Sequence, residues 1–342
     1  MIAVVHLVWG PLGPLSLRRF LDAYKRHPAG AEHELTVLLN GVAPAQRREL
    51  AAELGGIEHS MLELEQPMLD LSAYAWAARR LEHTHVCFLN SHSVPLAGDW
   101  LAKLARALEL PRAGLVGATG SWGSFRSAVL NSLRLPSPYR HAPEPPRAHR
   151  RELWCEIERE LERAEPRLAA AGPRDPRVHR LLSRMRSLPQ LPERVLAFPG
   201  FPACHLRTNA FMAERAVFTA LRTPPISRKM DALRLESGHH SYTSQVHASG
   251  LRALVVARDG RSYDPEEWAA SHTFWQGAQE RLLIADNRTA VYQNGSLERR
   301  QLLSARAWGS QAEPFPPECL RPAPHDEPAR SAHAQPTALT RS

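Results

Sequence analysis

The sequence predicts an α/β protein whose mainly parallel sheet is flanked by helices. From residue 1 to residue 119, short apolar segments alternate with segments of helical length and spacing, which is the pattern of βαβ units. Several apolar segments also end abruptly at polar residues, as strands do at the ligand-binding edge of an open sheet. With 342 residues, 43% of them hydrophobic, the chain can bury one large core.

The expected elements follow from local patterns. Residues 3–9 form an apolar run that breaks at Gly10-Pro11 and lacks a basic leader, so we expect a first strand and no signal peptide. Residues 15–26 carry apolar side chains at helical spacing. The next helix has Pro44 near its start and Gly55 after its end, as helix termini prefer. The further elements expected, in chain order, are strand 34–40, helix 44–54, strand 57–64, helix 70–81, strand 86–89, helix 99–108 and strand 113–119.

The sequence predicts one domain over residues 1–310 and a disordered tail over 311–342, which is rich in Pro, Ala, Arg and Ser. Within the domain, the β/α pattern of residues 1–122 is interrupted by residues 123–194 and resumes in 195–310. The interruption contains charged amphipathic segments at 152–168 and 177–188. We therefore expect a helical insertion or lid there.

Charge and cysteine content narrow the classes of protein. The formal net charge is +8, but arginines are interspersed with acidic residues, as on an ordinary solvated surface. This balance suits an anionic small molecule or membrane surface, whereas nucleic-acid binding predicts clustered basic and aromatic residues. The four cysteines lie far apart, which favours reduced thiols and a cytoplasmic location. No apolar segment is long enough to span a bilayer.

The most informative polar segment is Asn90-Ser91-His92-Ser93, directly after the buried run 86–89. Four consecutive polar residues at a strand end favour a binding site over a simple turn. A turn or helix-cap role for His92 is the alternative. Asn40 ends another strand in the same way.

Three sequence motifs resemble the nucleotide-sugar-dependent glycosyltransferases of the GT-A fold, and family 2 in particular. They are 37–41 (VLLNG), 85–93 (HVCFLNSHS), and 235–240 (LESGHH) followed by a helix and 250–256 (GLRALVV). The resemblance covers about residues 1–122 and 195–260. It implies a GT-A-like, Rossmann-type fold and a transfer reaction from a nucleotide-sugar donor.

The resemblance also implies roles for particular residues. Glu236 takes the position of the catalytic base, directly before a helix over 241–248, where the helix dipole favours a carboxylate. A helix cap is the alternative role for Glu236, with Asp231 and His239 as fallback bases. The donor-binding candidates are Asn40, Asp70, Asn90, Ser91, His92, Arg207 and Lys229, and the acceptor-side candidates are His239 and Trp275. Tyr74, one turn from Asp70, and the polar Asp286-Asn287 pair are further candidates.

The chain departs from the family pattern at the metal motif. Asn90-Ser91-His92 stands where such enzymes carry Asp-x-Asp. Mn²⁺ and Mg²⁺ prefer carboxylate oxygens. Either His92 helps the substrate to hold a metal, or arginine and lysine neutralise the diphosphate without one.

The sequence thus predicts a glycosyltransferase, with inversion and hexosyl or deoxyhexosyl transfer favoured. The family suggests a glycan or glycolipid acceptor in bacterial surface polysaccharide synthesis. Such an acceptor would place the protein in the cytoplasm or in peripheral contact with the inner face of the membrane. A non-catalytic nucleotide-sugar binder of the same fold is the first alternative, and a basic nucleic-acid-binding protein is the second.

Overall fold

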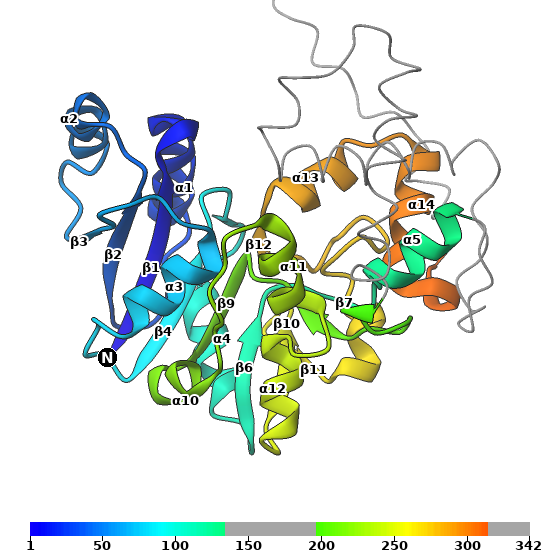
Figure 1. Ribbon diagram of the computed structural model, residues 1–342. Coiled ribbons are helices and arrows are strands. Elements are labelled where there is room, and N and C mark those ends of the chain that lie inside the picture. Colours follow the sequence, from blue (N-terminus) through cyan, green and yellow to red (C-terminus); the bar gives the residue numbers. More distant parts are fainter. Residues whose placement is uncertain (134–195, 314–342) are drawn as a thin grey trace, which may run out of the picture.

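The computed structural model describes residues 1–133 and 196–313 (Figure 1). The first range contains β1 (Ile2–Trp9), α1 (Pro14–Arg26), β2 (His33–Asn40), α2 (Pro44–Glu53), β3 (Ser60–Glu63), α3 (Asp70–Ala78), β4 (His85–Leu89), β5 (Val94–Pro95), α4 (Trp100–Leu108), β6 (Ala113–Gly117), β7 (Gly120–Ser121) and α5 (Phe125–Leu133). The second contains β8 (His205–Leu206), β9 (Ala210–Glu214), α10 (Arg215–Ala220), α11 (Lys229–Ser237), α12 (Tyr242–Ala248), β10 (Arg252–Val256), β11 (Ser262–Tyr263), β12 (Ile284–Ala285), α13 (Asn287–Gln293) and α14 (Leu297–Trp308). Short 3₁₀ turns lie at Gly10–Leu12, Pro265–Ser271 and Gly309–Gln311.

One eight-stranded sheet forms the centre, in the order β11-β10-β6-β9-β4-β1-β2-β3. Strands β1, β2, β3 and β4 pair in parallel. Strand β9 lies antiparallel between β4 and β6, so β6 and its parallel neighbour β10 run in the same direction as β4. The carboxyl ends of six strands therefore meet at one edge of the sheet. This arrangement confirms the predicted fold class.

Helices cover both faces of the sheet and bury two separate cores (Figure 1). Helices α1, α2 and α4 pack on one face, and α3, α10, α11 and α12 pack on the other. Helix α4 shows why these elements form: its buried residues recur every three or four positions, which gives the helix one continuous apolar face. The fully buried Trp100 and Leu104 belong to that face.

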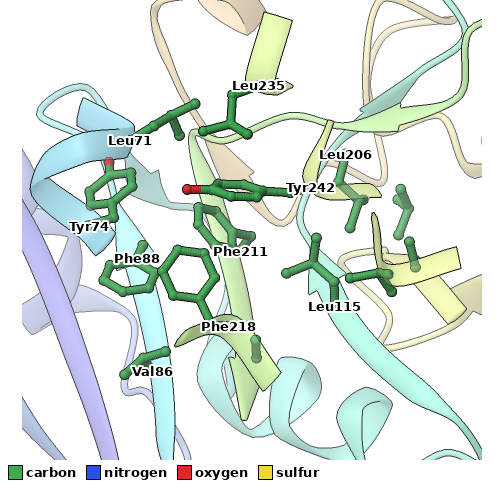
Figure 2. Packing of buried hydrophobic residues seen from close by; sticks show 14 of the residues in the cluster. Leu71, Tyr74, Val86, Phe88, Leu115, Leu206, Phe211, Phe218, Leu235 and Tyr242 are labelled. Carbon is green, nitrogen blue, oxygen red and sulfur yellow. The ribbon is translucent and has the colours of Figure 1, made fainter. Parts of the chain in front are cut away.

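An aromatic cluster fills the second core (Figure 2). Tyr74 of α3 stacks on Phe88 of β4 at 4.7 Å between ring centroids. Phe88 in turn contacts Phe211 of β9 at 5.3 Å and Phe218 of α10 at 5.0 Å. Tyr74 is fully buried in this cluster, so its ring packs in the core and does not face a nucleotide.

Most predicted elements agree with the structure to within a few residues. The strand expected over 57–64 is shorter, Ser60–Glu63. The antiparallel insertion of β9 was not predicted, because an apolar run carries no information about strand direction. Helix α5 lies where the helical insertion over 123–194 begins. The segments expected at 152–168 and 177–188, and the tail beyond residue 313, lie outside the described residues.

Candidate active site

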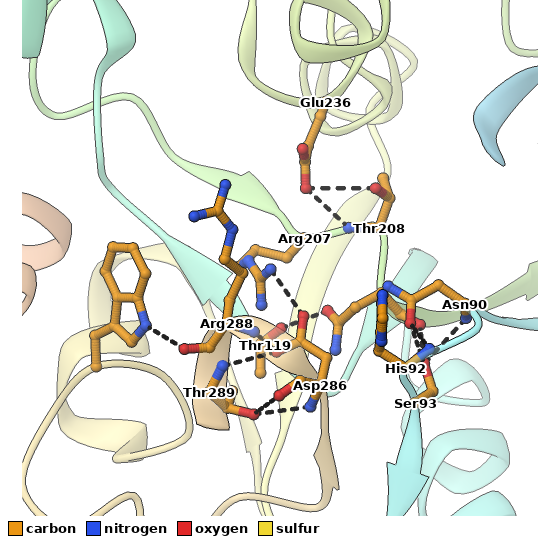
Figure 3. Close-up of polar contacts among 12 residues, drawn as sticks. Asn90, His92, Ser93, Thr119, Arg207, Thr208, Glu236, Asp286, Arg288 and Thr289 are labelled. Carbon is orange, nitrogen blue, oxygen red and sulfur yellow. Dashed lines mark hydrogen bonds and ion pairs between the residues drawn. The ribbon is translucent and has the colours of Figure 1, made fainter. Parts of the chain in front are cut away.

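Polar residues gather at the carboxyl edge of the sheet. Asn40 ends β2, Asn90 follows β4, Thr119 follows β6, and Asn209 directly precedes the antiparallel β9. Thr119 Oγ1 donates to Asn209 Oδ1 at 2.8 Å, and the backbone N–H of Asn90 donates to the Asn209 carbonyl at 2.9 Å. The neighbouring strand ends are thus joined directly to each other (Figure 3).

The Asn90–Ser93 segment is a turn whose polar atoms bind other parts of the chain. Asn90 Oδ1 accepts from the His92 N–H at 2.8 Å and from Ser93 Oγ at 3.1 Å. Ser91 Oγ donates to the Leu7 carbonyl at 2.7 Å and accepts from the backbone N–H of Trp9 at 3.0 Å. The buried side chains of this turn therefore stabilise the ends of β4 and β1.

Asn40 and Asp70 also have structural partners. The buried Asn40 side chain donates to the Met68 carbonyl at 2.7 Å and accepts from the Met68 N–H at 3.1 Å. Asp70 Oδ1 accepts from the Leu71 N–H at 3.0 Å at the start of α3. Both contacts hold the connection between β3 and α3. Donor binding by Asn40, Asp70, Asn90, Ser91 and His92 stays a prediction.

A cavity of about 130 Å³ opens next to this edge. Residues of β7, α5, β8, α11 and the C-terminal segments line it, and three of them are arginines. The lining residues are Ser121, Gly123, Ser124, Phe125, His205, Arg207, Leu233, Glu236, Ser237, Phe274, Trp275, Arg288, Arg306 and Ala307. One carboxylate, one imidazole, three guanidinium groups and aromatic rings therefore meet in one small space.

Glu236 is the acidic residue of the cavity wall. Its Oε1 accepts from the backbone N–H of Thr208 at 3.2 Å and from Thr208 Oγ1 at 3.3 Å (Figure 3). The expected position before a helix is wrong: Glu236 lies in the last turn of α11 (Lys229–Ser237). Helix α12 begins later and is capped by Ser241, whose side chain accepts from the Ser244 N–H. The carboxylate is held in place by its hydrogen bonds from Thr208 and not by the N-terminus of a helix.

Arg207 forms a buried ion pair beside the cavity. Its Nη2 lies 2.9 Å from Asp286 Oδ2, and the Asp286 side chain is fully buried. The guanidinium also lies over the Phe274 ring, 4.4 Å from the ring centroid. Burial alone would raise the pKa of Asp286, but Arg207 and the hydrogen bonds from Thr289 hold it below its ordinary value. Among the described residues, Arg207 Nη1 and Asn209 Nδ2 are buried donors without a partner.

His205 is one of three ionisable cavity residues that sequence reasoning missed. It lies in β8, two residues before Arg207, and its Nδ1 is 2.7 Å from the Ala203 carbonyl. The signal was its place in the polar segment that precedes the apolar strand β9. Arg288 and Arg306 were missed as well, because arginines on helices are usually solvated.

Aromatic residues form one wall of the cavity. Trp275 stacks on Phe274, with ring centroids 4.4 Å apart and planes inclined by 20°. Trp275 Nε1 donates to the Arg288 carbonyl at 3.1 Å, and this leaves the ring positioned at the wall. Trp268 is fully buried, and Trp122 Nε1 donates to the backbone of the Pro265 turn, so these two indoles are structural.

Three other predicted residues lie outside the cavity wall. Lys229 is exposed at the first turn of α11, about 10 Å along the axis from Glu236. Asp231 accepts from the Arg228 N–H at 3.0 Å and forms ion pairs with Arg228 and Arg234, which makes it a capping residue. His239 is exposed after the helix. The structure does not bring these three together with Glu236.

Residues 1–133 and 196–313 contain no group of three or more His, Cys, Asp or Glu side chains that could hold a metal ion. The amide and hydroxyl oxygens of the Asn90 turn are poor ligands for a divalent metal, because they are neutral and already hydrogen-bonded. Apart from the exposed His92 ring, the turn therefore offers no side chain suited to a divalent metal. Within the same ranges, no helix is long and apolar enough to cross a membrane.

Comparison with known proteins gives fold likeness only. No protein-family model matches the chain, and no curated protein sequence does either. Among solved structures, the chain is similar to a mannosyltransferase from Pyrobaculum calidifontis in complex with GDP-Man and Mn²⁺, at 12% identity and a TM-score of 0.40, over 80% of this chain and 59% of that one. It is also similar to S. aureus TarS 1-349 at 13% identity and a TM-score of 0.27, over 34% of each chain. It is similar as well to GalNAc-T7 with UDP, GalNAc and Mn²⁺, at 14% identity and a TM-score of 0.29, over 34% of this chain and 22% of that one. The chain thus spans less than two thirds of each, and likeness at these scores establishes no activity.

Proposed function

We propose that the protein is a glycosyltransferase that moves a sugar from a nucleoside-diphosphate donor to a hydroxyl acceptor. The observation that carries the proposal is the cavity that is lined by Glu236, His205 and three arginines. Such a reaction needs a group that takes a proton from the acceptor and positive charge that stabilises the departing diphosphate.

The arginines supply the positive charge in this proposal. Arg207 is held rigidly by Asp286 and Phe274, and Arg288 and Arg306 line the same space. Guanidinium groups bind phosphate oxygens in a bidentate manner. In this proposal the arginines neutralise the diphosphate in place of a metal. A metal would need carboxylates at the end of β4, where this chain has Asn90.

The aromatic wall suits a sugar. Trp275 and Phe274 present stacked rings to the cavity, and the Trp275 indole is held by its bond to the Arg288 carbonyl. Rings of this kind cover the apolar face of a pyranose while polar groups bind its hydroxyls. Ser121, Ser124 and Ser237 provide hydroxyls in the same wall.

The finer features of the function come from the family resemblance of the sequence motifs. They are inversion at the anomeric carbon, transfer of a hexosyl or deoxyhexosyl group, and a glycan or glycolipid acceptor in surface polysaccharide synthesis. The alternative of a non-catalytic nucleotide-sugar binder is favoured by one observation, the absence of carboxylates at the Asn90 turn.

Donor binding is tested by thermal unfolding with UDP-, GDP- and dTDP-sugars, each with and without Mn²⁺. A ligand that binds only the native state raises the free energy of unfolding by about 2.7 kcal/mol at one hundred times its Kd. We expect a nucleotide sugar to stabilise the protein, and the Arg207→Gln variant to lose most of that gain. The matched control is Arg222→Gln, at an exposed arginine away from the cavity wall.

Three outcomes of this experiment separate the hypotheses. Binding with release of nucleoside diphosphate supports the enzyme, and binding without turnover on a panel of acceptors supports the non-catalytic binder. Stabilisation by DNA or RNA, with none by any nucleotide sugar, contradicts the proposal and favours a nucleic-acid-binding protein.

A further inference from the structure

The neutral ring of His205 is held in one tautomer by its hydrogen-bond partner. His205 Nδ1 lies 2.7 Å from the carbonyl oxygen of Ala203. A carbonyl oxygen only accepts hydrogen bonds, so Nδ1 carries the proton. A neutral imidazole has a single N–H, which leaves Nε2 with a free lone pair. His205 lines the cavity together with Glu236 and the arginines.

The surroundings of His205 favour the neutral ring at neutral pH and still assist a proton transfer. Burial lowers the pKa of His205 most, whereas the Glu236 carboxylate and the Ala203 carbonyl raise it and Arg207 lowers it. Arg288 and Arg306 are the other charged groups of the cavity wall. The ring is therefore neutral before the reaction, and Glu236 stabilises the imidazolium that proton uptake creates.

Thr208 holds the Glu236 carboxylate in place through one of its two oxygens. Its Oε1 already accepts two hydrogen bonds from Thr208, at 3.2 and 3.3 Å. This arrangement holds a negative charge in the same cavity wall as the imidazole, where it favours the protonated ring.

We propose that His205 is the general base of the transfer reaction and that Glu236 stabilises its protonated form. The inference rests on the proposed function and assigns the proton to a named atom. The acceptor O–H bond breaks and its proton passes to His205 Nε2. The acceptor oxygen bonds to the anomeric carbon as the bond from that carbon to the phosphate oxygen breaks. The electron pair of the broken bond leaves with the nucleoside diphosphate.

The first test is the His205→Asn variant, because its amide N–H can replace Nδ1–H at the Ala203 carbonyl while Nε2 is lost. We expect kcat to fall by about 100- to 10,000-fold, with donor KM and melting temperature close to wild type. His247→Asn, at an exposed histidine of α12 outside the cavity wall, is the matched control and should keep full activity. If folded His205→Asn keeps more than a tenth of the wild-type kcat, the inference is wrong.

The second test is the pH dependence of kcat/KM, which a purely structural histidine would not control. We expect the wild-type rate to fall at acidic pH as His205 is protonated. In Glu236→Gln the acid limb should move to lower pH, because the group that raises the pKa of His205 is removed. An unmoved limb overturns the inference, and this test does not depend on whether His205→Asn folds.

The third test separates this inference from the proposed function. ¹⁵N NMR of the histidine rings without any substrate should show Nδ1–H and an unprotonated Nε2 for His205 at pH 7.5. A proton on Nε2 overturns the inference even if the enzyme is active. If wild type binds no nucleotide sugar, glycosyl transfer itself is refuted. If wild type is active and His205→Asn is equally active, only the role of His205 fails.

Discussion

Glu236 Oε1 accepts hydrogen bonds from both the backbone N–H and the hydroxyl of Thr208, at 3.2 and 3.3 Å. These bonds join the last turn of α11 to the connection that leads into β9. The position of the carboxylate at the cavity thus depends on the sheet edge as well as on its own helix.

Glu236→Gln tests the role of this carboxylate. Glutamine keeps an oxygen that can accept from Thr208, so we expect the free energy of unfolding to change by at most about 1 kcal/mol. Turnover should fall by about 100- to 10,000-fold, since the amide neither accepts a proton nor stabilises an imidazolium. Urea denaturation and steady-state kinetics on one preparation give both quantities.

A matched control lies on the same helix. Asp231 caps the start of α11 and lies outside the cavity wall, so Asp231→Ala should cost about 0.5–2 kcal/mol and leave turnover intact. If Asp231→Ala abolishes turnover in the folded protein while Glu236→Gln does not, the roles of the two carboxylates are reversed.

The Arg207–Asp286 pair is expected to contribute strongly to stability. Asp286→Asn leaves the largely buried Arg207 charge without its carboxylate partner, which typically costs about 3–5 kcal/mol. Arg207→Gln should cost less, because the Asp286 carboxylate keeps the backbone N–H donors of Arg288 and Thr289. Urea denaturation of both variants tests the order, and equal or reversed losses would contradict it.

Sequence reasoning predicted the βα order because hydrophobic periodicity reports the local burial of each element. It could not give the position of β9, since strand order depends on contacts between distant segments. The Asn90 turn shows the same limit. Its polar residues were predicted to bind a ligand, but Ser91 bonds to Leu7, 84 residues away, and Ser93 bonds to the Asn209 carbonyl, 116 residues away.

Only part of the candidate site was predicted, because contacts between distant segments also decide which residues meet at the cavity. Arg207, Glu236 and Trp275 were selected from the sequence and line one cavity. His205 was not selected, because its place in the polar segment before β9 does not show its role without its partner. That partner, the Ala203 carbonyl, belongs to the backbone and leaves no mark in the residue types.

Metal removal tests the interpretation of the Asn90 turn. We expect EDTA to reduce turnover by less than about tenfold, because neutral and already bonded oxygens bind Mn²⁺ and Mg²⁺ weakly. Complete loss of activity with EDTA, restored by Mn²⁺, would show that a metal is held there after all.

His92→Ala then distinguishes a ligand from a turn residue, because His92 joins the turn through its backbone N–H and its ring is exposed. Loss of turnover at an unchanged melting temperature would mean that the ring contacts substrate or metal. A fall in melting temperature alone would indicate a role in the turn.

His6 is expected to make the fold sensitive to acid. The ring is fully buried in β1 and stacks on Phe20 with centroids 3.9 Å apart. Neither ring nitrogen has a hydrogen-bond partner among the described residues. Burial, followed by the charge of His92, lowers the pKa of His6 from 6.5 to about 3. The folded protein therefore keeps this ring neutral at mildly acidic pH, whereas the unfolded chain protonates it.

The sign of the effect follows from proton linkage. Above pH 6.5 the ring is neutral in both states and has no effect on the pH dependence. Below that pH the unfolded state binds the additional proton, so the free energy of unfolding falls until the pH reaches the folded pKa. Between pH 7.5 and pH 4.5 this loss amounts to about 3 kcal/mol. In His6→Leu the loss between these two pH values should be smaller by about that amount.

Urea denaturation of wild type and His6→Leu at the two pH values measures the difference directly, and other titrating groups cancel in the comparison. His240→Gln is the control, because His240 is exposed and a solvated ring can be protonated without unfolding. If wild type and His6→Leu lose the same free energy between pH 7.5 and pH 4.5, the buried His6 ring is protonated in the folded state, and its environment is more polar than the contacts with Phe20 indicate.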